Sequence, residues 1–186
     1  KSIFQIYMKI YDCFQFFDEE MLLDLRLNML DKYVDKFVIS EAKYKHNGSP
    51  KKLIFDINKF SQFKHKIIYV VAEDPSSSLL EINNNDSNEL KESKKISNAY
   101  RREGHQIEKI QEVIADIDSD DIIIISDLDE IPNLEKIDFR KISQKLIFFR
   151  QKMFYYKLNL FYKLMPWYGS KACKKKHFIS PQWLRS

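Results

Sequence analysis

The chain has 186 residues, of which 44% are hydrophobic and 31% charged, a composition typical of one globular domain and not of a disordered chain. Its three glycines form no G-x-G-x-x-G or P-loop pattern, which argues against a Rossmann dinucleotide site and a Walker ATPase. Cys13 and Cys173 lack metal-ligand spacing and cannot build a disulfide framework. The net charge of +4 permits attraction to phosphates or an anionic membrane surface but identifies no partner.

Strand and helix patterns alternate along the first half of the chain. Residues 1–7 read as a lead-in, and acidic residues from Asp18 open an amphipathic helix that ends near Leu30. Its broad apolar face is expected to include Met21, Leu25 and Met29, while Arg26 is expected to pair with a neighbouring carboxylate. Strands are predicted over residues 8–14, 36–41 and 66–72, and the second of them ends in the acid Glu41.

A polar stretch and a long helix follow the third strand. Residues 75–88 predict a long mobile loop that could act as a lid, although low complexity would equally fit an inert insertion. Residues 89–117 predict a helix with a kink or break at Gly104. Arg101 and Arg102 lie in its middle. Paired arginines on a helix are usually solvated, but the guanidinium group is also the preferred partner of a diphosphate.

The most informative stretch is residues 120–132. Four consecutive isoleucines, residues 122–125, predict a central parallel strand buried on both faces. Asp127, Asp129 and Glu130 follow at its carboxyl end, where open α/β sheets bind ligands. Asp127 and Asp129 point to the same side of an extended chain and suit Mg²⁺ or Mn²⁺, which can hold a diphosphate. The alternative is that these aspartates only cap and turn the chain.

The order of elements predicts the α/β class, with a mostly parallel central sheet flanked by helices in a single domain. Residues 145–186 contain a further strand and a run rich in aromatic residues. Such a run is expected to be core for most of its side chains. The alternative is that Tyr156, Asn159 and Trp167 line an acceptor groove, because aromatic faces stack on sugar rings and an amide binds hydroxyls.

Several of these segments together resemble glycosyltransferase family 17, the family of β-1,4-mannosyl-glycoprotein β-1,4-N-acetylglucosaminyltransferases. The resemblance runs from about residue 8 to residue 185 and is specific in its Tyr-Asp-Cys-Phe and Asp-x-Asp-Glu-Ile-Pro elements. The segments that carry it are residues 8–17, 25–31, 37–42 and 124–132.

The resemblance implies a GT-A-like nucleotide-sugar-binding fold, a UDP-sugar donor, Mn²⁺ or Mg²⁺, a glycan acceptor and transfer with inversion. Asp127 would contact the ribose or share the metal ion, and Asp129 would bind the metal ion. Glu130 would orient the site or face the acceptor. Among the acids present in the chain, Glu130 is the first candidate for the base that takes the acceptor proton, and Glu41 is the second. The candidates for binding the nucleotide are Asp12, Arg101, Arg102 and Asp127.

The chain also departs from the family pattern. Relatives tend to carry a Trp-Glu-Asn-type element where residues 97–100 read Ser-Asn-Ala-Tyr. Relatives also continue into a segment with Gly-Gly-Trp-His and Ser-His-type elements, whereas this sequence stops at Ser186. The resemblance therefore predicts a truncated or degenerate member of the family.

Two other functions stay open from the sequence. One is a non-catalytic GT-A-like domain that binds a nucleotide or glycan, and the other is a phosphatase of the haloacid dehalogenase type. The expected partners are a nucleotide sugar and a glycan, not nucleic acid, with peripheral membrane contact as an alternative and the oligomeric state undetermined. A microbial or viral protein is expected in the cytoplasm, and an animal relative in the Golgi lumen.

Overall fold

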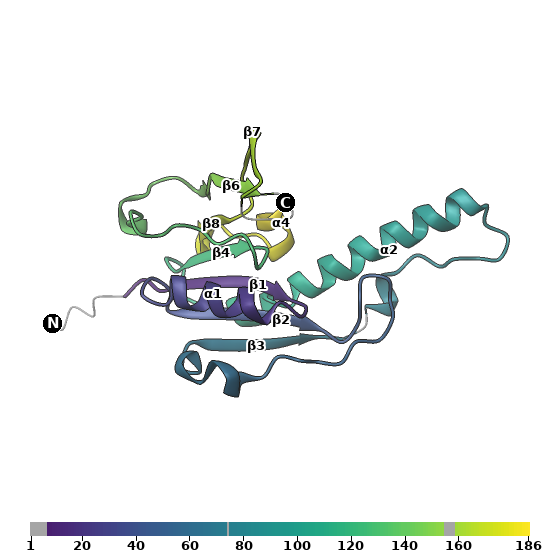
Figure 1. Cartoon of the computed structure of the whole chain (residues 1–186), viewed down its shortest axis with the longest axis horizontal. Helices are drawn as coiled ribbons and strands as arrows, with labels where there is room; N and C mark the ends of the chain where they lie inside the picture. The colour runs from purple at the N-terminus through teal and green to yellow at the C-terminus, as the bar shows by residue number, and fades with distance from the viewer. Residues whose placement is uncertain (1–6, 74, 155–158) are drawn as a thin grey trace.

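The computed structural model describes residues 7–73, 75–154 and 159–186. Within these ranges the chain forms a six-stranded sheet in the order β3-β2-β1-β4-β8-β5, with helices on both of its faces (Figure 1). Its strands are β1 (Ile10–Phe16), β2 (Lys36–Ala42), β3 (Ile67–Ala72), β4 (Ile122–Ser126), β5 (Leu146–Phe148) and β8 (Lys171–Lys174).

The strands β1, β2, β3 and β4 run parallel, whereas β8 is antiparallel to both β4 and β5. The carboxyl ends of β1, β2 and β4 therefore meet at one edge of the sheet, as expected for a parallel arrangement. The predicted α/β class with a mostly parallel central sheet is confirmed. One neighbour of β4 is antiparallel, which the apolar run of its sequence does not reveal.

The isoleucines of β4 connect the two hydrophobic cores of the domain. Side chains alternate across a strand, so Ile122 and Ile124 lie in the core on one face while Ile123 and Ile125 lie in the core on the other. All four are at most 1% exposed. The prediction that this strand is buried on both faces is therefore confirmed.

Helices pack on both faces of the sheet. Leu23, Leu27 and Leu30 of α1 pack on one face, and Ile107, Ile110, Ile114 and Leu184 pack on the other. The amino-terminal half of α2 projects away from the sheet (Figure 1). The α-helices are α1 (Glu20–Leu30), α2 (Asn88–Glu108), α3 (Gln111–Ile114) and α4 (Pro181–Arg185). The 3₁₀ helices are η1 (Ile57–Phe63), η2 (Ser76–Ser78), η3 (Phe139–Lys141) and η4 (Lys175–His177).

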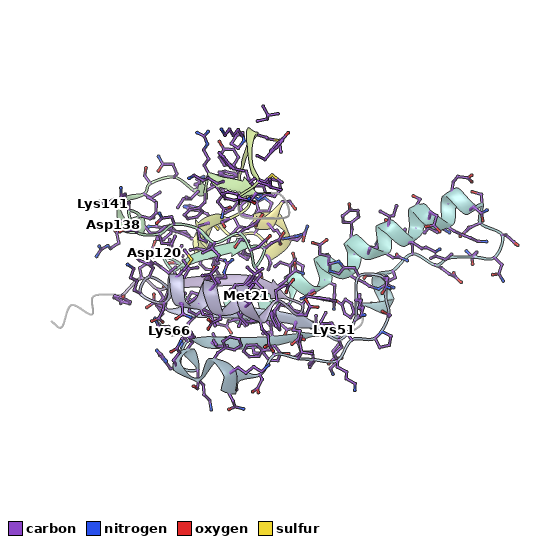
Figure 2. All side chains as sticks on the ribbon, viewed as in Figure 1. Met21, Lys51, Lys66, Asp120, Asp138 and Lys141 are labelled. Atoms are coloured by element: carbon purple, nitrogen blue, oxygen red, sulfur yellow. The ribbon has the colours of Figure 1, made fainter. Side chains whose placement is uncertain are left out.

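Three details of the predicted helices are wrong. The helix predicted over residues 89–117 ends at Glu108, and the separate helix α3 follows it. Met21, Leu25 and Met29 do not join the apolar face of α1 but are 82%, 48% and 53% exposed, and Figure 2 shows Met21 on this helix. Arg26 is buried in their place because its charge is paired, as predicted. Gly104 does not break the long helix, since α2 continues through it to Glu108. The helical pattern alone cannot distinguish a tolerated glycine from a break.

The polar stretch before α2 is attached to that helix. The side chain of Asn98 bonds both backbone groups of Leu80, at 2.7 and 2.9 Å. Ser87 caps the first turn of α2 by accepting a hydrogen bond from the backbone of Leu90. The mobility expected of residues 75–88 stays a prediction.

The aromatic run after β5 forms a hairpin instead of core. Strands β6 (Gln151–Phe154) and β7 (Phe161–Trp167) pair with each other as a separate two-stranded sheet that projects from the main one (Figure 1). The prediction of core is wrong for seven large side chains of this run, which are 37% to 85% exposed. They are Phe154, Leu160, Phe161, Leu164, Met165, Trp167 and Tyr168. Among the described residues, no helix is long and apolar enough to cross a membrane.

Candidate functional site

The turn that follows β4 is held by a buried arginine. Arg26 donates to both oxygens of Asp12, at 2.7 and 2.8 Å, and both side chains are fully buried. The same guanidinium donates to the hydroxyl of Ser126 at 2.6 Å and to the backbone carbonyls of Asp127 and Leu128 at 2.9 and 3.1 Å. Arg26 thereby fixes the backbone that presents Asp127 and the residues after it.

The predicted nucleotide-binding role of Asp12 does not fit this arrangement. Its carboxylate is 0% exposed and is occupied by Arg26, so a ligand cannot reach it without breaking the ion pair. Asp12 instead supports the turn through Arg26.

A cavity of about 590 Å³ opens at this edge of the sheet. It brings together the ends of β1 and β4, the loop after β2, one side of α2 and the last residues of α4. Its walls combine apolar side chains with polar and charged ones. The lining residues are Gln15, Phe16, Phe17, Glu19, Leu22, Lys45, His46, Asn47, Glu103, Gln106, Asp127, Leu128, Asp129 and Arg185. We call this cavity the large pocket.

Asp127 and Asp129 both line the large pocket, as their place after β4 predicted. Asp129 is exposed, whereas Asp127 is partly buried and paired. Among the described residues no cluster of three or more His, Cys, Asp or Glu side chains could hold a metal ion alone. A divalent cation at Asp129 or Asp127 would therefore need further oxygens from a bound ligand or from water, which is usual for Mg²⁺.

Arg185 is the principal site residue that the sequence did not reveal. Its Nε lies 2.9 Å from Oδ1 of Asp127, and its Nη2 lies 3.2 Å from Oδ2 and 2.5 Å from Oε1 of Glu103. Burial acts to lower the pKa of Arg185, but its hydrogen bonds and charge interactions with Asp127 and Glu103 outweigh this and raise the pKa. No local motif surrounds Arg185, because its partners lie 58 and 82 residues earlier in the chain.

A second cavity of about 300 Å³ adjoins the first, with Asp127 and Arg185 in the walls of both. Its other lining residues are Glu130, Trp167, Tyr168, Gly169, Lys171 and Ser186. We call it the small pocket. It receives Glu130 from the end of β4 and aromatic rings from the end of β7. The prediction that residues 145–186 form the acceptor side of the site stays a prediction.

Glu130 is held in a defined orientation in the small pocket. The indole Nε1 of Trp167 donates to its Oε1 at 2.6 Å, and the backbone N of Asp127 donates to its Oε2 at 2.8 Å. Gly169 permits this approach, since a Cβ at that position would lie 2.0 Å from Oε1 of Glu130. Burial lowers the pKa of nearby Lys171, while the charge of Glu130 partly opposes this effect.

Glu41 is the second candidate base. In the described part of the chain it is not among the residues that line the large or the small pocket. It is 0% exposed and accepts hydrogen bonds from the backbone of Ile54 and Phe55, the hydroxyl of Tyr69 and the ammonium group of Lys51. Burial and the bond to Glu41 raise the pKa of Tyr69. Through these bonds the carboxylate of Glu41 links β2 to β3 and to the loop after β2 that carries Lys51, Ile54 and Phe55. Because the carboxylate is buried, an acceptor sugar cannot reach it.

Arg101 and Arg102 also lie outside the described lining of the two pockets. Arg101 donates to the carbonyl of Ser78 at 2.8 Å on the surface. Arg102 donates to the carbonyl of His46 at 3.2 Å and packs on Gly48. Gly48 has a φ of +91°, which favours glycine, and a Cβ there would lie 2.6 Å from the guanidinium. Arg102 therefore braces the loop that carries Lys45, His46 and Asn47 into the large pocket.

The predicted acceptor-binding residues have three different outcomes. Trp167 lines the small pocket and contacts Glu130. Asn159 is exposed in the turn region between β6 and β7 and is not among the lining residues of either pocket. Tyr156 lies outside the described residues.

Comparison with known proteins gives one match. The family model described as Glycosyltransferase family 17 matches residues 2–179. No curated protein matches the chain, and no solved structure matches it. The matched segment includes Asp127, Asp129, Glu130 and Trp167, whereas Arg185 lies beyond it.

Proposed function

Because the chain belongs to glycosyltransferase family 17, we propose that it transfers N-acetylglucosamine from its UDP-sugar to a hydroxyl group of a glycan acceptor. We propose further that the domain is of the GT-A type, depends on Mn²⁺ or Mg²⁺ and inverts the anomeric centre. The observation that carries the proposal is the end of β4, where Asp127, Asp129 and Glu130 lie at the boundary of two adjoining pockets. Family membership gives no support to the phosphatase alternative.

The large pocket suits the donor. Phe16, Phe17 and Leu22 provide apolar surface for a base, and Gln15 and Asn47 provide amide groups for hydrogen bonds. The pocket lies beyond the carboxyl ends of β1 and β4, where parallel sheets commonly bind nucleotides. Its volume of about 590 Å³ is within the range of pockets that hold ligands of this size.

The charge of the large pocket supports metal dependence. Its described lining contains four carboxylates, from Glu19, Glu103, Asp127 and Asp129, but only two Lys or Arg side chains, Lys45 and Arg185. A diphosphate would therefore be repelled unless a cation entered with it. Asp129, with Asp127 when it is released by Arg185, would hold a divalent cation that stabilises charge on the departing UDP.

The small pocket suits the acceptor. Trp167 and Tyr168 offer ring faces on which a sugar can pack, and Glu130 offers a carboxylate whose oxygens keep lone pairs beyond the two hydrogen bonds they accept. Residues 145–186 would thus form the acceptor side of the single domain.

Glu130 acts as the general base in this proposal. The acceptor oxygen forms a bond to the anomeric carbon while the bond from that carbon to the diphosphate oxygen breaks. The proton of the acceptor hydroxyl passes to Glu130, and UDP leaves with the electron pair of the broken bond. The hydrogen bonds from Trp167 and from the backbone of Asp127 orient the carboxylate for this transfer.

The proposal is tested by incubating the protein with UDP-N-acetylglucosamine, Mn²⁺ and a panel of mannose-containing glycans, with products identified by mass spectrometry. The expected result is an acceptor heavier by one N-acetylhexosamine, and loss of this product in Asp129→Asn. Metal-dependent binding of UDP without transfer to any acceptor would favour the non-catalytic binding domain. Failure to bind any nucleotide sugar would contradict the proposal.

A further inference from the structure

Arg185 lies between two of the carboxylates of the proposed donor site, those of Asp127 and Glu103. Its guanidinium donates to both oxygens of Asp127 in a fork, at 2.9 and 3.2 Å, and reaches Glu103 at 2.5 Å. The three side chains are only partly buried, with exposed fractions of 21%, 44% and 22%. An arginine on this wall of the pocket can therefore change partners without a cost in core packing.

The support for Arg185 comes from α4 and α2. Glu108 of α2 accepts hydrogen bonds from the hydroxyl of Ser180 and the backbone of Gln182, both at 2.8 Å. Leu184 of α4 is buried in the core with Ile107 of α2. The backbone of Arg185 is thus anchored, while its side chain extends into the space that both pockets share.

This pairing makes Asp127 a poor cation ligand in the donor-free protein. Both of its oxygens already accept hydrogen bonds from a positive group, and a divalent cation beside Asp127 would lie within a few ångströms of that group. Two positive charges at such a distance repel each other strongly in a partly desolvated site. A cation that arrives alone must therefore compete with Arg185 for Asp127.

The same guanidinium is well suited to a diphosphate. Its planar fork donates two parallel hydrogen bonds to phosphate oxygens as readily as to a carboxylate. We propose that Arg185 exchanges partners when donor and cation bind together, releasing Asp127 to the cation and binding the donor diphosphate. This inference rests on the proposed function, since it assumes that the large pocket binds a nucleoside diphosphate with a divalent cation.

The exchange predicts that cation and nucleotide bind cooperatively. The diphosphate draws Arg185 away from Asp127, which improves the cation site, and the cation by occupying Asp127 frees Arg185 for the diphosphate. Linkage requires that each ligand raises the affinity of the other by the same factor, and typical couplings of this kind are about 5-fold to 150-fold.

The test measures two affinities in the wild type and in Arg185→Gln. Binding of Mn²⁺ alone is followed by the electron paramagnetic resonance signal of free Mn²⁺, and binding of UDP at saturating Mn²⁺ is followed by calorimetry. The substitution is expected to raise the affinity for Mn²⁺ alone by about 10-fold, because the competing cation is gone. It is expected to lower the affinity for UDP by about 10-fold or more, because a charge-assisted fork is lost.

Opposite changes in the two affinities distinguish this exchange from a structural role, which would lower both or neither. Arg140→Gln is the matched control, because it removes an exposed arginine that also forms a fork with an aspartate, Asp138, and that is not among the described lining residues of either pocket. It is expected to leave binding of Mn²⁺ alone within about 2-fold of the wild type, as surface charge effects are small. Arg185→Lys keeps the charge without the fork, so its affinity for UDP is expected to lie between those of the wild type and Arg185→Gln.

Three outcomes would overturn the inference. They are unchanged affinities in Arg185→Gln, a fall in both affinities with an unchanged thermal midpoint, or no Mn²⁺ binding by either protein. Glu103→Gln is the second variant, for the case in which Arg185→Gln fails to fold. It removes one partner of Arg185 but keeps the pair with Asp127. Its binding of Mn²⁺ alone should therefore stay weak, and binding of Mn²⁺ and UDP should stay strongly coupled. If the wild type binds Mn²⁺ but never UDP, the proposed function fails, while a higher Mn²⁺ affinity in Arg185→Gln would still identify the competition at Asp127.

Discussion

Asp12 and Arg26 form a fully buried ion pair at 2.7 Å, and the guanidinium of Arg26 also bonds the backbone carbonyls of Asp127 and Leu128. The pair therefore joins β1 and α1 to the turn that carries the candidate site. A buried charge that keeps all its partners is tolerated, but one that loses its partner is strongly destabilising. This relationship connects the stability of the fold to the geometry of the site.

Breaking that ion pair should destabilise the whole domain. Asp12→Asn is expected to lower the free energy of unfolding by about 3 to 5 kcal/mol, because it leaves the Arg26 guanidinium buried without its counter-charge. Urea denaturation measures the change. The matched control is Glu20→Gln, which breaks an exposed ion pair with Lys59 and should cost less than about 1 kcal/mol. Similar costs for the two variants would show that the buried pair does not have this role.

Substitutions of the two candidate bases, Glu130 and Glu41, should have different effects, the first on activity and the second on stability. Glu130→Gln is expected to reduce the rate of transfer by about 10² to 10⁴-fold with little change in the thermal midpoint, because it removes the proton acceptor of the small pocket. The control is Glu41→Gln, which should cost about 1 to 3 kcal/mol of stability because Glu41 is buried and accepts several hydrogen bonds. Its folded fraction should keep transfer activity. The opposite pattern would assign the base to Glu41.

Adding a methyl group beside Glu130 should disturb the small pocket selectively. In Gly169→Ala the new Cβ would lie 2.0 Å from Oε1 of Glu130 and 2.5 Å from Nε1 of Trp167, so both side chains must move. We expect loss of transfer at least 10-fold, since small displacements of catalytic groups have large effects on rate. Donor binding in the large pocket should persist. The rate of transfer and the affinity for the donor are both measured with the purified variant.

Gly104→Ala is the matched control for that substitution. Gly104 lies within α2, and a Cβ there would come no closer than 3.8 Å to its neighbours. The substitution should stabilise the helix by about 0.5 to 1 kcal/mol and leave transfer unchanged. Equal activity in the two variants would mean that the contact between Gly169 and Glu130 is not needed for transfer.

The buried thiols predict a specific dependence of stability on pH. Burial raises the pKa of Cys173 to about 12, with the charge of Lys175 partly opposing it, and the ordinary value is 9.0. Because the folded pKa is the higher one, the stabilising contribution is complete below about pH 9 and is lost as pH rises towards 12. The free energy of unfolding should therefore fall more steeply above pH 9 in the wild type than in Cys173→Ala. Parallel pH profiles would contradict the raised pKa.

The same pKa shifts predict low reactivity. Burial also raises the pKa of Cys13 well above its ordinary value, so both cysteines are neutral and inaccessible thiols in the folded protein at pH 8. Alkylation by iodoacetamide at that pH should require unfolding. Rapid labelling of the native protein, followed by mass spectrometry, would show that one of the two sites opens.

The sequence predicted those features whose signal is local. The isoleucines of β4 and the acids that follow them occupy the expected places, because a β-branched run and the carboxyl end of a strand have few alternatives. Arg26 was expected to pair, and its partner proved to be Asp12.

Other features depend on residues that are distant in the chain. Met21 and Leu25 fit the apolar face of a helix, but the sheet beneath α1 instead receives Arg26. The aromatic run of β7 has the composition of a core strand, yet it pairs only with β6 and remains exposed among the described residues. Arg185 has no motif around it, and its importance follows only from its contact with Asp127, 58 residues away.

The most direct test of the proposed donor site compares thermal midpoints with UDP-N-acetylglucosamine, with and without Mn²⁺, for the wild type and Asp129→Ala. A ligand at about 100 times its dissociation constant adds roughly 2.7 kcal/mol, which should raise the midpoint by about 5 °C or more in a domain of this size. We predict a rise that requires Mn²⁺ and is absent in Asp129→Ala. No rise in the wild type under any condition, or an equal rise in Asp129→Ala, would contradict a donor site at the end of β4.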